Sequence, residues 1–149
     1  MTVLAKILKE TIGKCILFNC TLLFLYITAE KKIVIDKKNY KFKLFLDDIL
    51  VSESSFRIEH PDKWFNEKYV TIHDLKTVKN FQGKGYAKYL LEQIFNYVKN
   101  ELKINIITLL VYKNNYKAVN LYLKCGFEIY QDYDDNKNQS FILIKKLKI

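Results

Sequence analysis

The feature that most constrains this chain is a glycine-containing turn with the sequence QGKGYA, from Gln82 to Ala87. It follows a strand-like pattern, precedes a helix-like pattern, and holds two of the four glycines in the 149-residue chain. Successive backbone N–H groups in a turn that opens a helix form an anion site, which the helix dipole strengthens. Side chains in place of Gly83 and Gly85 would obstruct a diphosphate, and Lys84 adds a cation beside it. The turn therefore predicts a phosphate site, with a ligand-free glycine turn as the alternative.

Four segments before the turn have the β-branched or alternating pattern that is typical of strands. Residues 2–13 instead have the pattern of a short helix. The predicted strands cover residues 31–36, 40–46, 49–58 and 69–78, with a hairpin turn at Asp47-Asp48 and a loop at Pro61.

After the turn, the chain alternates between helix and strand patterns. The first helix carries apolar residues at Ala87, Leu90, Leu91, Ile94, Phe95 and Val98, and a nearly continuous apolar run predicts a buried strand at 104–112. Asn114 or Asn115 can cap a second helix that stops at Gly126. Two strands, 127–133 and 140–147, close the chain. The strand–helix–strand–helix order predicts a crossover unit in a mixed sheet.

The formal net charge of the chain is +9, and Arg57 is its only arginine. An excess of positive charge is typical of proteins with a polyanionic partner, such as nucleic acid, a membrane surface or a phosphorylated small molecule. Surfaces that bind phosphates usually favour arginine over lysine, however. A lysine-rich composition set by an AT-rich genome is therefore the favoured explanation, and a nucleic-acid partner is the alternative.

The run from Cys15 to Thr28 is apolar and needs a separate interpretation. Its 14 residues are fewer than the roughly 20 that span a bilayer, and Asn19 interrupts it. Lysines that precede it resemble the start of a secretion signal. A buried strand or helix is the favoured prediction, and no membrane partner is expected.

The cysteines and histidines lack the spacing of a disulfide framework or a zinc site. The cysteines are odd in number without a CxxC pair, and the histidines lie far apart. Free thiols in a reducing cytoplasm, and no metal, are expected. The residues are Cys15, Cys20, Cys125, His60 and His73.

Three phosphate-binding motifs can be compared with the turn. A Walker loop does not fit, and Lys88 stands where a dinucleotide fingerprint needs a small residue. The pattern Q/R-x-x-G-x-G/A matches at every defined position. A second segment, NYKAVNLYLKCGF from Asn115 to Phe127, resembles N-x-x-A-x-x-L-Y-x-K-x-G-F. With these two motifs, residues 69–147 resemble the GNAT superfamily of acetyl-CoA-dependent N-acetyltransferases.

The resemblance implies an α/β (α+β) fold: a GNAT-like mixed, mostly antiparallel twisted sheet with a central parallel strand pair and flanking helices. It extends loosely to the strands from about residue 31. Residues 1–30 show no clear match and are expected to contribute to the acceptor side of one domain that covers residues 1–149.

The resemblance also implies acetyl-CoA as cosubstrate and direct attack of an amine on the thioester. The strand that ends at Thr77-Val78 is expected to separate from its parallel neighbour, and an N–H near Val78 to polarise the carbonyl. The implied cofactor contacts are Thr77, Val78, Gln82, Gly83, Lys84, Gly85, Tyr86, Ala87, Asn115 and Tyr122.

Three residues are candidates for proton transfer. Tyr122 matches the tyrosine that protonates the departing thiolate; its alternative role is core packing. Many relatives place a glutamate at the position of Thr71, and His73 lies on the same face of the strand with a suitable pKa. A purely structural histidine is the alternative there. For Asn115 the alternative role is helix capping.

The predicted activity is acetyl transfer to a primary amine on a small molecule such as a polyamine, an amino sugar or an amino acid. A protein or aminoacyl-tRNA acetyltransferase is one alternative, and a non-catalytic CoA- or RNA-binding module is another. Leu110 stands where relatives that acetylate protein N-termini often carry a glutamate or histidine, which makes peptide acceptors less favoured. A homodimer is possible.

Overall fold

The computed structural model describes residues 30–135 and 137–148. The helix expected at 2–13 and the buried segment expected at 15–28 lie outside the described residues. The chain divides into two units, Met1–Glu30 and Lys31–Ile149, and the elements described here belong to the second. The prediction of one domain over residues 1–149 stays a prediction.

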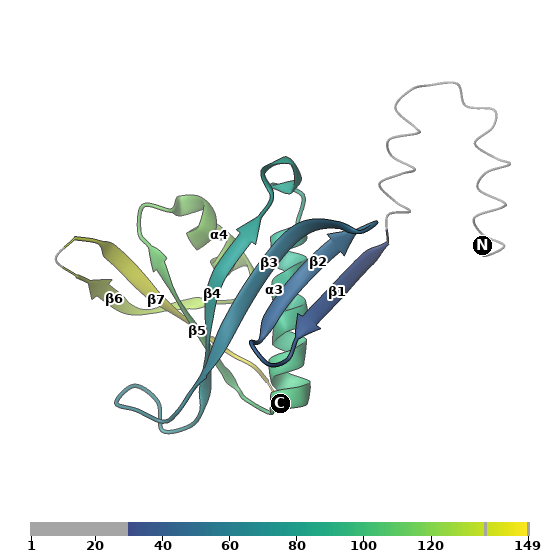
Figure 1. Ribbon diagram of the computed structural model, residues 1–149. Coiled ribbons are helices and arrows are strands. Elements are labelled where there is room, and N and C mark those ends of the chain that lie inside the picture. Colours follow the sequence, from purple (N-terminus) through teal and green to yellow (C-terminus); the bar gives the residue numbers. More distant parts are fainter. Residues whose placement is uncertain (1–29, 136, 149) are drawn as a thin grey trace, which may run out of the picture. The chain divides into compact units, whose positions relative to one another are not determined.

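A seven-stranded mixed sheet forms the framework of this unit (Figure 1). The strand order is β1-β2-β3-β4-β5-β7-β6, and only β4 and β5 run parallel. This arrangement confirms the predicted fold class with its central parallel pair. The strands are β1 (Lys31–Asp36), β2 (Lys41–Leu46), β3 (Ile49–Glu59), β4 (Tyr69–Thr77), β5 (Ile106–Tyr112), β6 (Glu128–Asp134) and β7 (Gln139–Lys146).

The two helices predicted after the glycine turn are present at the expected positions. Helix α3 (Tyr86–Tyr97) follows the glycine turn, and a π-helical turn (Val98–Leu102) continues it. Helix α4 (Tyr116–Lys124) begins after Asn115, whose side chain accepts a hydrogen bond from the backbone of the first turn. The Asp47-Asp48 hairpin is also confirmed: both residues have the positive φ that a tight hairpin turn requires.

Helix α3 covers one face of the sheet, as Figure 1 shows. The ring of Phe56 on β3 contacts Tyr97 of α3 with centroids 6.3 Å apart, and Phe56 pairs with Ile72 of β4. Because paired residues share a face, Ile72 and its own partner Leu109 on β5 face α3. Side chains alternate along a strand, so Thr71 faces the opposite side.

A β-bulge interrupts β4 before its end. Asp74 has a φ of 53°, and the pairing with β3 shifts register beside it. One extra residue reverses the faces of the side chains that follow. Leu75 and Thr77 therefore face the α3 side, where uninterrupted alternation from Ile72 would have placed Asp74 and Lys76.

The parallel strands separate close to this bulge. In the described residues, β4 and β5 pair only along Val70–Ile72 and Ile107–Leu109, while β5 continues to Tyr112 beside β7. The predicted separation of the strands is confirmed. It leaves a gap in the sheet that begins after Ile72.

Within residues 30–135 and 137–148, no helix combines the length and apolar character needed to cross a membrane.

Candidate active site

The glycine turn presents bare backbone at the start of α3. Gly83 and Gly85 have φ values of 74° and 84°, a left-handed conformation that side chains disfavour. In the described part of the chain, the N–H groups of Gly83, Gly85 and Ala87 donate no hydrogen bond to another protein group. A Cβ atom added at either glycine would meet nothing within 4 Å. The turn therefore needs glycine for its backbone conformation, and it leaves its amides open to a ligand.

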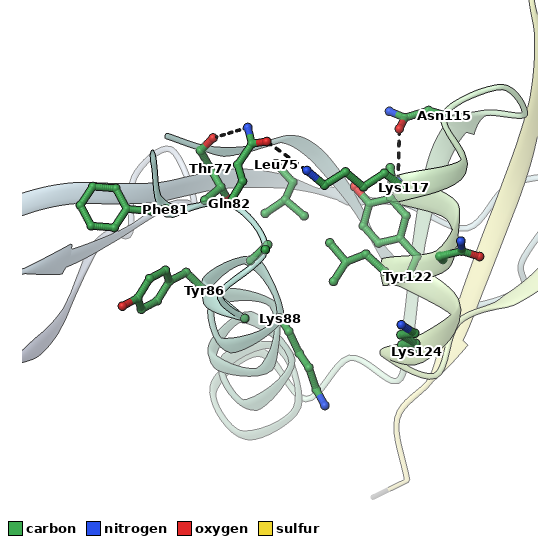
Figure 2. Close-up of a pocket in the computed structure, with 16 residues that line it drawn as sticks. Leu75, Thr77, Phe81, Gln82, Tyr86, Lys88, Asn115, Lys117, Tyr122 and Lys124 are labelled. Atoms are coloured by element: carbon green, nitrogen blue, oxygen red, sulfur yellow. Dashed lines mark hydrogen bonds between the residues drawn. The ribbon is translucent and has the colours of Figure 1, made fainter. Parts of the chain in front are cut away.

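Gln82 connects this turn to two other elements. Its Nε2 donates to the backbone carbonyl of Thr77 at 3.0 Å, and its Oε1 accepts from Nζ of Lys117 at 3.1 Å. Figure 2 shows both hydrogen bonds in line across the top of the site. The side chain thereby holds the end of β4, the turn and α4 together.

A cavity of about 660 Å³, here called the first cavity, opens between the turn, α3 and α4. Of the predicted cofactor contacts, Val78 and Lys84 do not line it. The others do: Thr77, Gln82, Gly83, Gly85, Tyr86, Ala87, Asn115 and Tyr122. Its lining also includes residues that were not among the predicted cofactor contacts, of which Ala118, Leu121 and Lys124 are defined positions of the second motif. The others are Leu75, Phe81, Lys88, Lys117 and Asn120.

The lysines among these residues leave a signal in the sequence. Lys117 and Lys124 lie seven residues apart, which places both on one face of α4, and Lys88 lies in the first turn of α3. Helical spacing beside the second motif would have found the α4 pair. Leu75 left no such signal, because it faces the cavity only as a result of the β-bulge.

The N–H expected near Val78 is not that of Val78 itself. The Val78 N–H donates to the carbonyl of Val51 on β3 at 2.9 Å. Backbone groups alternate in direction along a strand, so the N–H groups of Leu75 and Thr77 point to the side that β5 has left. The carbonyl of Thr77 agrees with this direction, because it accepts from Gln82 and not from β3.

Tyr122 lies on the face of α4 that lines the first cavity (Figure 2). Burial, with a smaller contribution from nearby Cys125, raises the pKa of its phenol to about 12. The ring also contacts Phe127 edge-on, with centroids 5.8 Å apart. The phenol is therefore neutral and carries its proton across the physiological pH range.

Asn115 caps α4 and also lies at the first cavity. Its Oδ1 accepts from the N–H of Ala118 at 3.2 Å, so it caps α4, and its side chain also lines the first cavity. Capping does not exclude a cofactor contact, since the amide nitrogen is a separate donor.

The two candidates for the base lie away from the first cavity. Thr71 lines a second cavity on the opposite face of the sheet, where its Oγ1 lies 3.0 Å from Oγ1 of Thr108. His73 lines neither cavity. Its Nε2 is buried and has no hydrogen-bond partner in the part of the chain that the structure describes. The structure thus does not bring His73 together with Tyr122.

Comparison with known proteins agrees with this geometry. The sequence profile of the Acetyltransferase (GNAT) family matches residues 33–127. A probable spermine N(1)-acetyltransferase of Bacillus subtilis subsp. natto is 30% identical over 69 residues, which are 46% of this chain and 44% of that relative. This chain therefore aligns with less than half of the length of that curated relative.

Solved structures share the fold at low identity. The ribosomal-protein-S18-alanine N-acetyltransferase of Escherichia coli has a TM-score of 0.62 at 15% identity, covering 76% of this chain and 72% of that one. NAA60 of Arabidopsis thaliana in complex with acetyl-CoA has a TM-score of 0.61 at 17% identity (72% and 76% covered). Spermidine N-acetyltransferase of Vibrio cholerae has a TM-score of 0.59 at 21% identity, covering 71% of this chain and 63% of that one. Together with the profile match and the site, these likenesses identify the chain as a member of the GNAT family of acetyltransferases.

Proposed function

We propose that this protein transfers an acetyl group from acetyl-CoA to a primary amine on a small molecule, such as a polyamine, an amino sugar or an amino acid. The observation that carries the proposal is the set of three amides, those of Gly83, Gly85 and Ala87, that have no protein acceptor in the described residues and lie beside the cavity that Tyr122 lines. Acetyl-CoA supplies a diphosphate that these amides can bind and a thioester that can lie in the cavity beside Tyr122.

The turn fits the diphosphate for two physical reasons. The N–H groups of Gly83, Gly85 and Ala87 are donors without protein acceptors in the described part of the chain, and they lie at the positive end of the α3 dipole. Lys88 and Lys117 add cations at the rim of the cavity. These groups hold the cosubstrate by its phosphates, so that its thioester end points toward β4.

We assign the role of polarising the thioester carbonyl to the N–H of Leu75. This N–H points to the gap that β5 leaves, and Leu75 lines the first cavity. A fixed backbone donor stabilises the oxyanion that forms when the amine attacks the carbonyl carbon. This assignment specifies the donor expected near Val78, whose own N–H is already paired.

Tyr122 then acts as the general acid. When the amine nitrogen forms its bond to the carbonyl carbon, the carbon–sulfur bond breaks and the electron pair stays on sulfur. The neutral phenol donates its proton to that thiolate. The attacking nitrogen loses a proton to water or to a base, for which Thr71 and His73 remain predictions.

Two alternatives from the sequence stay open to test: a protein or aminoacyl-tRNA acetyltransferase, and a non-catalytic CoA- or RNA-binding module. The protein or aminoacyl-tRNA alternative is supported by neighbours such as the S18-alanine enzyme and by the net charge of +9. A tRNA complex whose affinity falls steeply with salt would favour it. Location in the cytoplasm and a homodimer stay predictions.

The direct experiment measures release of the CoA thiol from acetyl-CoA with a panel of amines, amino acids, peptides and polyamines. Turnover with at least one small primary amine is expected. Binding of acetyl-CoA without turnover of any acceptor would contradict the proposal and favour a non-catalytic binding module.

A further inference from the structure

The second cavity, here called the aromatic groove, measures about 240 Å³. It lies on the face of the sheet opposite α3, because Thr71 and its partner Thr108 form part of its lining. Its volume is smaller than the roughly 300 to 1,000 Å³ of sites for drug-sized ligands. Five aromatic side chains surround it: Trp64, Phe65, Tyr69, Tyr130 and Tyr133.

A short loop fixes these rings in place. One carboxylate oxygen of Asp62 accepts from the backbone N–H groups of Trp64 and Phe65 at 2.8 and 3.2 Å. The other accepts from the hydroxyl of Tyr69 at 2.8 Å. The ring of Phe65 contacts those of Tyr69 and Tyr130, with centroids 4.8 and 5.5 Å apart. These contacts hold the rings of Phe65, Tyr69 and Tyr130 together, while Trp64, Tyr130 and Tyr133 stay partly exposed at the groove.

The groove ends at the gap between the parallel strands. Thr71 and Thr108 lie one residue before the last β4–β5 pair, Ile72–Leu109. Leu110, the first β5 residue beyond that pair, lines the groove. A molecule in the groove therefore reaches the gap from the face opposite the first cavity.

The charge of the groove restricts its ligand. None of its described lining residues carries a formal charge, although the chain as a whole carries +9. Ring faces attract a single cation, as the Nζ of Lys63 shows by lying 4.8 Å from the centroid of the Trp64 ring.

We propose that the aromatic groove binds the acceptor, and that this acceptor is a small primary amine with one positive charge and an apolar body of about the size of an aromatic ring. This inference rests on the proposed function and narrows it. A polyamine would leave its further ammonium groups without carboxylates in the lining. An amino sugar would place its hydroxyls against a mostly aromatic and aliphatic lining, in which the two threonine hydroxyls already bond to each other.

Trp64 gives a direct measurement, because it is the only tryptophan in the chain. Titration with phenethylamine is expected to change its fluorescence saturably, whereas spermidine and glucosamine leave it unchanged at equal concentration. Tyr130→Ala should weaken phenethylamine binding at least about tenfold. Ile129→Ala is the matched control, because Ile129 is the neighbour of Tyr130 on β6, is similarly exposed and lies outside the groove. The dissociation constant of phenethylamine should be unchanged in this variant.

Turnover separates this inference from the proposed function. The inference predicts a higher kcat/KM for phenethylamine than for spermidine or glucosamine, and a loss of that preference in Tyr130→Ala. A higher kcat/KM for spermidine, untouched by Tyr130→Ala, would overturn the inference and leave the acetyltransferase in place. A Trp64 response to phenethylamine without acetylation of any amine would support the groove and overturn the proposed function.

Discussion

At the scale of the residue, the proposed mechanism depends most on Tyr122. Its raised pKa comes from burial, so the phenol is an acid that does not ionise before it is needed. Tyr122→Phe keeps the packing against Phe127 but removes the proton. We expect kcat to fall about 100-fold, within the usual range for a general acid, while the KM for acetyl-CoA changes little. Steady-state kinetics measures both.

Tyr116→Phe is the control for that experiment. Tyr116 lies in the same helix, is 74% exposed and does not line the first cavity. An unchanged kcat in Tyr122→Phe would assign Tyr122 to the core, which was its alternative role.

The same pKa predicts how stability depends on pH. Below pH 10 the phenol is neutral in both the folded and the unfolded chain, so it has no effect there. Between pH 10 and about 12 the unfolded chain ionises first, so the free energy of unfolding falls. At pH 11 the loss from this one group is about 1.4 kcal/mol. Urea unfolding at pH 8 and pH 11 should show a smaller drop in Tyr122→Phe than in the unmodified chain.

Leu75 supplies a test of the backbone donor. Its N–H faces away from β3, so Leu75→Pro removes that donor without removing a hydrogen bond of the β3–β4 ladder. We expect kcat to fall by about 100- to 1000-fold. Leu75→Val, which keeps the N–H, should stay within a few-fold of the unmodified enzyme. Equal losses in both variants would assign the effect to the side chain.

At the scale of the element, the glycine turn and the two helices were predictable because their signals are local. The apolar spacing from Ala87 to Val98 predicted α3, and Asn115 and Gly126 predicted the ends of α4. The bulge was not predictable. Asp74 adopts a positive φ that aspartate tolerates but does not signal, and the register shift depends on pairing with β3. The family resemblance therefore placed the donor only near Val78, without identifying Leu75.

Alanine substitutions separate the two properties of the glycine turn. Gly85→Ala places a side chain at a φ of 84°, which costs about 1 to 2 kcal/mol and disturbs the amides that face the cavity. We expect lower stability and weaker binding of acetyl-CoA, measured by calorimetry. Gly126→Ala is the control for the backbone conformation, because Gly126 has a φ of 85° but lies outside the first cavity; its new Cβ would also require the flexible Lys145 side chain to move. It should lose stability and keep its affinity.

At the scale of the whole molecule, the gap between β4 and β5 lies between the two cavities. The first cavity lies on the side of α3 and α4, and the aromatic groove lies on the other. The crossover order of the elements predicted the parallel pair. The groove could not be predicted, because its rings come from the loop after β3 and from β4 and β6, which meet only in the folded sheet.

The central claim is that the bare amides at the start of α3 hold the diphosphate of acetyl-CoA. With only four glycines in the chain, selective ¹⁵N-glycine labelling yields a two-dimensional NMR spectrum of few signals. CoA is expected to shift the amide signals of Gly83 and Gly85 and to leave Gly126 in place, whereas pantetheine, which lacks the diphosphate, should shift none of them. Saturable CoA binding with the Gly83 and Gly85 signals unmoved would contradict the claim.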